Sequence, residues 1–166
     1  MLIRDETAAD IPAISRLVTE ALLMLAQSTG TEARIVEKLR AEGALALSLV
    51  AEEAGEVIGY LAASAARVGT QDGWALIGPL AVSPSRHRRR IGTDLMEEAL
   101  RRLQATSQGA ALVGDPAYYG RFGFRAFPGL YVSGCPPEVV QALPFDGTVP
   151  RGELVHHPAF GLDQQA

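Results

Sequence analysis

Cysteine is nearly absent from this sequence: Cys135 is the only one among 166 residues. A lone cysteine excludes an intramolecular disulfide framework and any zinc site built from several cysteine ligands. The sequence also lacks a run of about 18 apolar residues, the length that suggests a membrane helix. Its first ten residues, MLIRDETAAD, carry charges where a signal peptide needs an uninterrupted apolar stretch. We therefore expect a cytoplasmic protein with no membrane partner.

The sequence also has fewer basic than acidic residues. Fifteen Lys and Arg residues stand against 19 Asp and Glu, which gives a formal net charge of −4 and a pI of about 5.4. This balance argues against a nucleic-acid partner, so any anion site must be local. Hydrophobic residues make up 48% of the chain, enough for a buried core. We expect a single domain over residues 1–166, in which 128–166 is a C-terminal elaboration.

Apolar periodicity predicts the helices, and short apolar runs predict the strands. Thr7 with Asp10 resembles a capping box at the start of the first helix. The expected elements are an edge strand at 2–6, helices at 11–22 and 31–43, strands at 44–52, 56–66 and 74–82, a helix ending near Leu103, and a buried strand at 110–113. Their order predicts an α/β (α+β) fold with a mixed, mostly antiparallel sheet flanked by helices.

A basic loop between a strand and a helix is a candidate anion site. Unpaired N–H groups in the first helical turn and the positive end of the helix dipole both favour a bound phosphate. Gly92 would let the backbone approach a ligand. The loop contributes four arginines: Arg86, Arg88, Arg89 and Arg90. A solvated basic face on which Gly92 only starts a helix is the alternative interpretation, and residue types alone favour neither.

The loop is not one of the common nucleotide-binding loops. It lacks the GxxxxGK[ST] pattern of a Walker phosphate loop and the three glycines of the dinucleotide fingerprint. The stretch GPLAVSPSRHRRRIGT, followed by an amphipathic helix, instead resembles the acetyl-CoA-binding motif of the GNAT superfamily of N-acetyltransferases, [RQ]xxGx[GA] after a strand. The blocks GDPAYYGRFGF and GELVHHPAF are similar to the YhbS-like subgroup.

The strong resemblance covers about 44–127 and implies the acyl-CoA N-acyltransferase (GNAT) fold with acetyl-CoA as cosubstrate. In this register His87 stands where Arg or Gln is usual, Arg90 stands at the first glycine, and Gly92 fits the second. The Cβ of Arg90 narrows the room for a ligand, and arginine adopts left-handed torsions only at a cost. The cofactor-binding residues implied by the resemblance are Leu80, Ala81 and Val82 on the strand and Arg88, Arg89, Arg90, Ile91, Gly92 and Thr93 in the loop.

The resemblance also implies a general acid, Tyr119, which stands four residues before Gly123. An amine would attack the thioester directly while Tyr119 protonates the coenzyme A sulfur. A tyrosine has a reference pKa of about 10 and can donate a proton at neutral pH without special tuning. Packing of a turn is the alternative role for these aromatic residues, and we assign it to Tyr118. Asp115 is expected to cap a short helix that starts near Pro116.

No general base and no metal site can be identified in the sequence. His156 and His157 are adjacent, so in a strand they would point to opposite faces and could not bind one metal together. Cys135 has no evident activating partner, which gives no support to a covalent mechanism. Solvated charge is the role expected for Glu52, Glu53 and Glu56.

Two functions therefore remain open. The first is an N-acetyltransferase that acts on a small-molecule or peptide amine. The second, suggested by Arg90 in place of a glycine, is a non-catalytic module on the same fold that senses an acyl-CoA or binds a protein. The sequence does not specify the acceptor, and either a monomer or a homodimer is compatible with it.

Overall fold

The computed structural model describes residues 1–23, 30–86 and 90–160. The helices are α1 (Ile11–Leu23), α2 (Glu32–Ala41), α3 (Ile91–Leu103) and α4 (Pro116–Tyr119), with short 3-10 turns η1 (Ala8–Asp10), η2 (Pro84–Arg86), η3 (Gly120–Phe122) and η4 (Pro137–Val139). The strands are β1 (Leu2–Asp5), β2 (Leu45–Glu53), β3 (Glu56–Val68), β4 (Gln71–Val82), β5 (Gly109–Val113), β6 (Leu130–Tyr131), β7 (Val140–Pro144) and β8 (Gly152–Val155).

The strands form a mixed sheet in the order β1-β2-β3-β4-β5-β7. All neighbours along this path are antiparallel except β4 and β5, which run parallel. Strand β8 pairs with the C-terminal end of β3, at Arg67 and Val68, and the short β6 runs parallel to β8. The predicted fold class, with its mostly antiparallel sheet and flanking helices, is confirmed.

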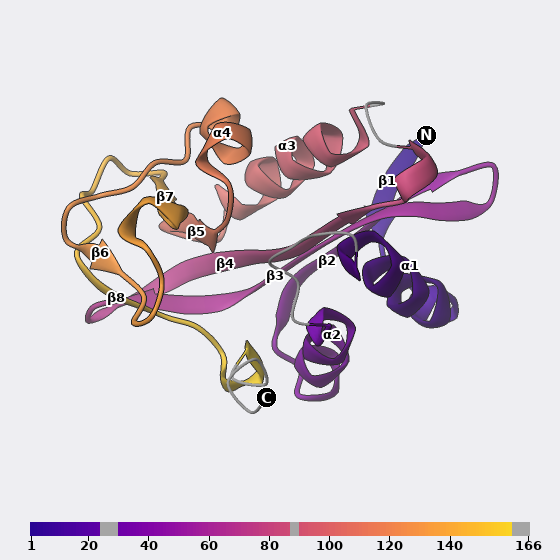
Figure 1. Cartoon of the computed structure of the whole chain (residues 1–166), viewed down its shortest axis with the longest axis horizontal. Helices are drawn as coiled ribbons and strands as arrows, with labels where there is room; N and C mark the ends of the chain where they lie inside the picture. Colours follow the sequence, from indigo (N-terminus) through magenta and orange to yellow (C-terminus); the bar gives the residue numbers. More distant parts are fainter. Residues whose placement is uncertain (24–29, 87–89, 161–166) are drawn as a thin grey trace.

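Helices cover both faces of the sheet, with α3 and α4 on one side and α1 and α2 on the other (Figure 1). The amphipathic α3 buries Leu95, Met96 and Ala99 completely in the core on its side. On the opposite face, α1 packs Ile14 and Val18 into a separate cluster. The helix patterns in the sequence therefore correspond to the faces that are buried.

The predicted capping box at the start of the first helical segment is confirmed. The Thr7 N–H donates to Oδ2 of Asp10 over 2.7 Å. Two hydrogen bonds from the Arg4 guanidinium hold the pKa of the Asp10 carboxyl well below its usual range, against the opposing effect of burial. This arrangement ties the end of β1 to the start of α1.

The C-terminal residues extend the sheet, because β7 pairs with β5 at the end of the strand order and β8 pairs with β3. His156 and His157 follow β8, which ends at Val155, and so lie outside the strand. His157 Nδ1 instead accepts a hydrogen bond from the Ala159 N–H over 2.9 Å. Assignment of residues 1–166 to one domain stays a prediction.

None of the helices in the described part of the chain combines the length and apolar character needed to span a bilayer. Within the same residues, no group of three or more His, Cys, Asp or Glu side chains is arranged to hold a metal ion.

Candidate active site

The parallel strands β4 and β5 pair along only part of their length. Their described ladder joins Trp74–Leu76 to Gly109–Ala111, whereas β4 continues to Val82 and β5 to Val113. Beyond this ladder β5 pairs with β7 on its other side, and β4 keeps its pairing with β3. The two strands therefore separate toward their carboxyl ends, which is the edge where α/β sheets commonly bind ligands.

The antiparallel ladder with β3 determines where the backbone groups at the end of β4 point. The Ser83 N–H donates to the Ile58 carbonyl over 2.9 Å. Because bonding alternates along such a ladder, the polar backbone groups of Leu80 and Val82 point away from β3, toward the side from which β5 departs. Those of Ala81 point toward β3, and its buried side chain packs on the α1 face. Two of the three predicted β4 residues thus have the orientation that backbone binding requires.

Helix α3 begins beside this edge, at Ile91, with Arg90 as its N-cap. Arg90 adopts the left-handed conformation, with φ of 61°, a region that glycine enters without strain. Its side chain is 70% exposed and lies 3.9 Å from the Asp94 carboxylate and 3.8 Å from that of Glu97. Arginine therefore occupies the glycine position without closing the start of the helix. The predicted site residues Arg88 and Arg89, like His87, lie outside the described residues.

The remaining residues predicted at the start of α3 differ in exposure. Ile91 and Gly92 are buried, and Thr93 is half-buried. Ile91 points its side chain into the core with Leu95, so its backbone is the part available to a ligand. A phosphate bound here would meet the N–H groups of the first helical turn.

Arg86 does not face this helix end. Its guanidinium pairs with the carboxylate of Glu53 and lies 3.5 Å from that of Glu56, the two residues that flank the β2–β3 hairpin turn. Glu52 pairs with Arg4 over 3.2 Å. Ion pairs therefore join these three glutamates to other elements, although the Glu56 side chain is still 67% exposed, and Arg86 serves to attach η2 to the hairpin.

Helix α4 lies across this edge from the start of α3, and it starts as predicted at Pro116 with Asp115 as its N-cap. The Asp115 carboxylate accepts a hydrogen bond from the Ala117 N–H over 2.9 Å, and Pro116 occupies the first turn. Tyr119, at the end of α4, lies on the backbone of Gly114, where β5 has just ended. Its ring makes edge-to-face contacts with Tyr118 and Phe124, with centroid distances of 4.9 and 6.3 Å.

Burial raises the pKa of the Tyr119 hydroxyl to about 12, and electrostatic repulsion from Tyr118 and Asp115 adds to this rise. The hydroxyl makes no hydrogen bond to any of the described residues. Tyr119 is therefore a protonated donor throughout the physiological pH range. It lies on the β5 side of the edge where the strands separate.

Tyr118 has a contact that sequence reasoning missed. A methyl group added at Gly92 would lie 2.7 Å from the Tyr118 hydroxyl oxygen, so this side chain spans from α4 to the first turn of α3. The lack of a side chain at Gly92 thus makes room for a tyrosine of the protein itself. Adjacent tyrosines in sequence give no signal of this contact, because it depends on the relative placement of two helices.

The packing role of Gly59 in β3 was also not predicted from the sequence. A methyl group at this position would lie 2.8 Å from Cγ2 of Ile91 and 2.9 Å from Cδ1 of Leu95. Its lack of a side chain lets the first turns of α3 pack directly on the sheet. A single glycine in a strand is compatible with a bulge or with close approach, and only the packing distinguishes these roles.

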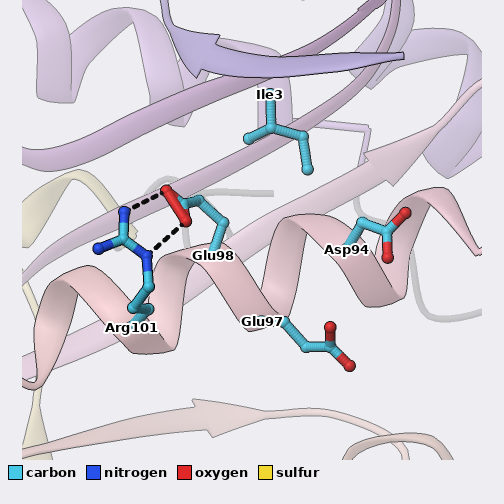
Figure 2. Close-up of a pocket in the computed structure, with 5 residues that line it drawn as sticks. All are labelled: Ile3, Asp94, Glu97, Glu98 and Arg101. Atoms are coloured by element: carbon cyan, nitrogen blue, oxygen red, sulfur yellow. Dashed lines mark hydrogen bonds and ion pairs between the residues drawn. The ribbon is translucent and has the colours of Figure 1, made fainter.

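A surface groove of about 370 Å³ lies elsewhere, between β1 and the outer side of α3. It is lined by Ile3, Asp94, Glu97, Glu98 and Arg101, and Figure 2 shows Glu98 paired with Arg101. Those two side chains share hydrogen bonds of 2.7 Å. None of the predicted site residues lines this groove, so it is distinct from the edge formed by β4, α3 and α4.

The chain belongs to the GNAT family of acetyltransferases, whose acetyltransferase (GNAT) domain model matches residues 44–126. The uncharacterized N-acetyltransferase YhbS of Escherichia coli K12 is 39% identical over 128 residues, which cover 75% of this chain and 74% of that protein. The predicted resemblance to the YhbS-like subgroup, and with it the assignment to the acetyltransferases, is confirmed.

Two solved structures share the whole fold. A GNAT family acetyltransferase from Brucella melitensis in complex with acetyl-CoA superposes with a TM-score of 0.85 at 38% identity, covering 96% of this chain and 97% of that one. YhbS from E. coli in complex with CoA gives a TM-score of 0.86 at 31% identity, with 96% and 91% covered. The predicted cosubstrate agrees with the ligands named for these relatives.

Proposed function

We propose that this protein transfers the acetyl group of acetyl-CoA to a primary amine, with Tyr119 as the general acid. The observation that carries the proposal is the placement of Tyr119, a protonated and partly buried donor, on Gly114 where β4 and β5 separate. The start of α3 lies at the same edge of the sheet and supplies N–H groups for a phosphate.

The residues at this edge fit acetyl-CoA. Leu80 and Val82 direct backbone groups toward the space that the pantetheine arm would follow. The first-turn N–H groups of α3 would hold the pyrophosphate, and Arg90 leaves this helix end accessible. We assign cofactor binding to Leu80, Val82 and the backbone of 90–93, and to Arg88 and Arg89 on the resemblance alone.

Acetyl-CoA supplies an activated acyl group when bound, and the chain's own contribution is to orient it and to control one proton. The amine must arrive neutral, since only its lone pair can form the new C–N bond. As the C–S bond breaks, the sulfur takes the bonding electron pair, and Tyr119 holds a proton at its hydroxyl to neutralise the thiolate. The amine's surplus proton passes to water, and water returns a proton to the Tyr119 phenolate, which restores the donor for the next cycle.

The alternative function, a non-catalytic module, is suggested by the presence of Arg90 where the GNAT pattern has a glycine. The left-handed backbone and exposed side chain of Arg90 remove the steric reason for that alternative. A screen of amines, with thiol release as the readout, tests the choice directly. Turnover that requires Tyr119 supports the enzyme, whereas tight CoA binding without turnover of any amine supports a sensor.

The acceptor class, a small-molecule or peptide amine, follows from the family alone. We also propose a cytoplasmic location, which a chain with a single cysteine fits, and a single domain over 1–166.

A further inference from the structure

The side chain of Tyr118 is held out of the hydrophobic core. Its neighbours Tyr119 and Phe122 pack against the core cluster under α3, but Tyr118 does not belong to that cluster. Its ring instead stands edge-on to Tyr119 and to Phe122, at centroid distances of 4.9 and 5.7 Å. Core packing therefore does not account for its orientation.

The hydroxyl of Tyr118 is directed at the first turn of α3. A methyl group on Gly92 would lie 2.7 Å from the hydroxyl oxygen and 3.9 Å from Cζ of the same ring. The contact is with the second residue of the helix, whose first-turn N–H groups would hold a phosphate. Within the described chain the hydroxyl has no hydrogen-bond partner. It can therefore donate to an anion held by those N–H groups.

Arg121 brings a positive charge to the same place. Its guanidinium carbon lies 4.4 Å from the centroid of the Tyr118 ring, and its Nε donates to the Tyr118 carbonyl over 3.3 Å. This stacking holds both the ring and the charge beside the helix end. No carboxylate in the described chain pairs with Arg121, whereas Arg86 and Arg90 both lie near carboxylates.

We propose that Tyr118 and Arg121 form the second wall of the phosphate site, in which the Tyr118 hydroxyl donates a hydrogen bond to the pyrophosphate of acetyl-CoA and Arg121 offsets its charge. This inference rests on the proposed function. Under this proposal, neighbouring residues of the segment 118–121 have different roles. Tyr118 and Arg121 bind the phosphates, and Tyr119 protonates the sulfur of the thioester. An aromatic hydroxyl is a neutral donor, so it adds a directed bond where the helix N–H groups supply the others.

Calorimetric titration of three ligands tests the assignment: CoA, 3′-dephospho-CoA and pantetheine, each with the wild type and Tyr118→Phe. The variant keeps the ring and its stacking and removes only the hydroxyl. We expect the Kd of CoA and of dephospho-CoA to rise about tenfold, the usual effect of losing a hydrogen bond to a charged group, and that of pantetheine to stay unchanged. Arg121→Gln should act in the same direction, with an effect that shrinks at high salt.

Matched controls are available in the same C-terminal part. Arg125→Gln removes an equal charge from a side chain that stacks on Phe127 instead, and Tyr131→Phe removes the hydroxyl of an exposed tyrosine in β6. Both should bind CoA as the wild type does.

Each other outcome has a definite meaning. If the variants raise the Kd of CoA but not that of dephospho-CoA, the contact is with the 3′-phosphate, and the pyrophosphate assignment is wrong. An equal loss of affinity for pantetheine would mean that the contact is with the pantetheine arm. Unchanged Kd values in both variants would mean that Tyr118 only packs against its neighbours. A folded wild type that binds none of the ligands would instead refute the proposed function itself.

Discussion

The ring of Tyr119 rests on the backbone of Gly114: a methyl group at Gly114 would lie 2.5 Å from Cε2 of the ring and 3.0 Å from Cδ2. The glycine therefore sets the position of the proposed general acid at the end of β5. Gly114→Ala should displace the ring and lower kcat about tenfold, because a proton donor loses efficiency when its geometry is disturbed. Steady-state kinetics with a reactive amine would measure this, with KM for acetyl-CoA nearly unchanged.

Tyr119→Phe removes the proton donor and retains the packing of the ring. We expect kcat to fall about 100-fold, the lower part of the range for loss of a general acid. KM for acetyl-CoA should change little, and so should the unfolding midpoint, since the hydroxyl bonds to none of the described residues. Thiol release and thermal unfolding check the two expectations. An unchanged kcat would remove Tyr119 from the mechanism.

The buried Tyr60 and the partly buried Tyr119 should make the fold sensitive to alkali. Burial raises the pKa of Tyr60 to about 12, as it does that of Tyr119, although a bond between its hydroxyl and Ser48, 2.6 Å away, opposes the rise. Unfolded tyrosines lose their protons near pH 10, so both groups favour the folded state below that pH. The free energy of unfolding should fall between pH 10 and about 12.

Urea unfolding at several pH values between 9 and 11 would measure this slope. Tyr60→Phe cannot ionise at this position and should show a shallower decline than the wild type. A slope that is the same in both proteins would contradict the role given to Tyr60.

Gly59 should tolerate no side chain. Gly59→Ala places a methyl group 2.8 Å from Ile91 and 2.9 Å from Leu95, both buried, and overpacking of this kind costs about 1–3 kcal/mol of stability. Gly120→Ala is the control, since a methyl group there meets nothing within 4 Å and the backbone is already helical. Chemical denaturation of both variants would show a lower midpoint for Gly59→Ala only. Equal midpoints would mean that α3 adjusts freely on the sheet.

The sequence predicted the parts of the fold and of the site that depend on residues close together in the chain. The Thr7–Asp10 capping box, the Asp115 cap of α4 and the buried face of α3 each follow from residue types at fixed spacing. Features that depend on packing between distant segments could not be predicted in this way. The contact of Tyr118 with Gly92 and the pairing of Arg86 with Glu53 are examples, because each joins residues more than 20 positions apart.

Arg90 illustrates a different limit. Propensity argues against arginine in the left-handed region, where the strain is about 1–2 kcal/mol. The structure nevertheless places it there, because the start of α3 is determined by the burial of Ile91 and Leu95. The packing of these side chains therefore contributes more than that strain costs.

The central claim, that acetyl-CoA binds at the start of α3, is tested most directly by calorimetric titration of the folded protein with acetyl-CoA. Gly92→Asp is the matched variant, since it adds bulk against the Tyr118 hydroxyl and negative charge where a phosphate would lie. Thermal unfolding would verify that the variant is folded. We predict micromolar binding to the wild type and no detectable binding to Gly92→Asp. Equal affinity of both proteins, or no binding to a folded wild type, would contradict this account.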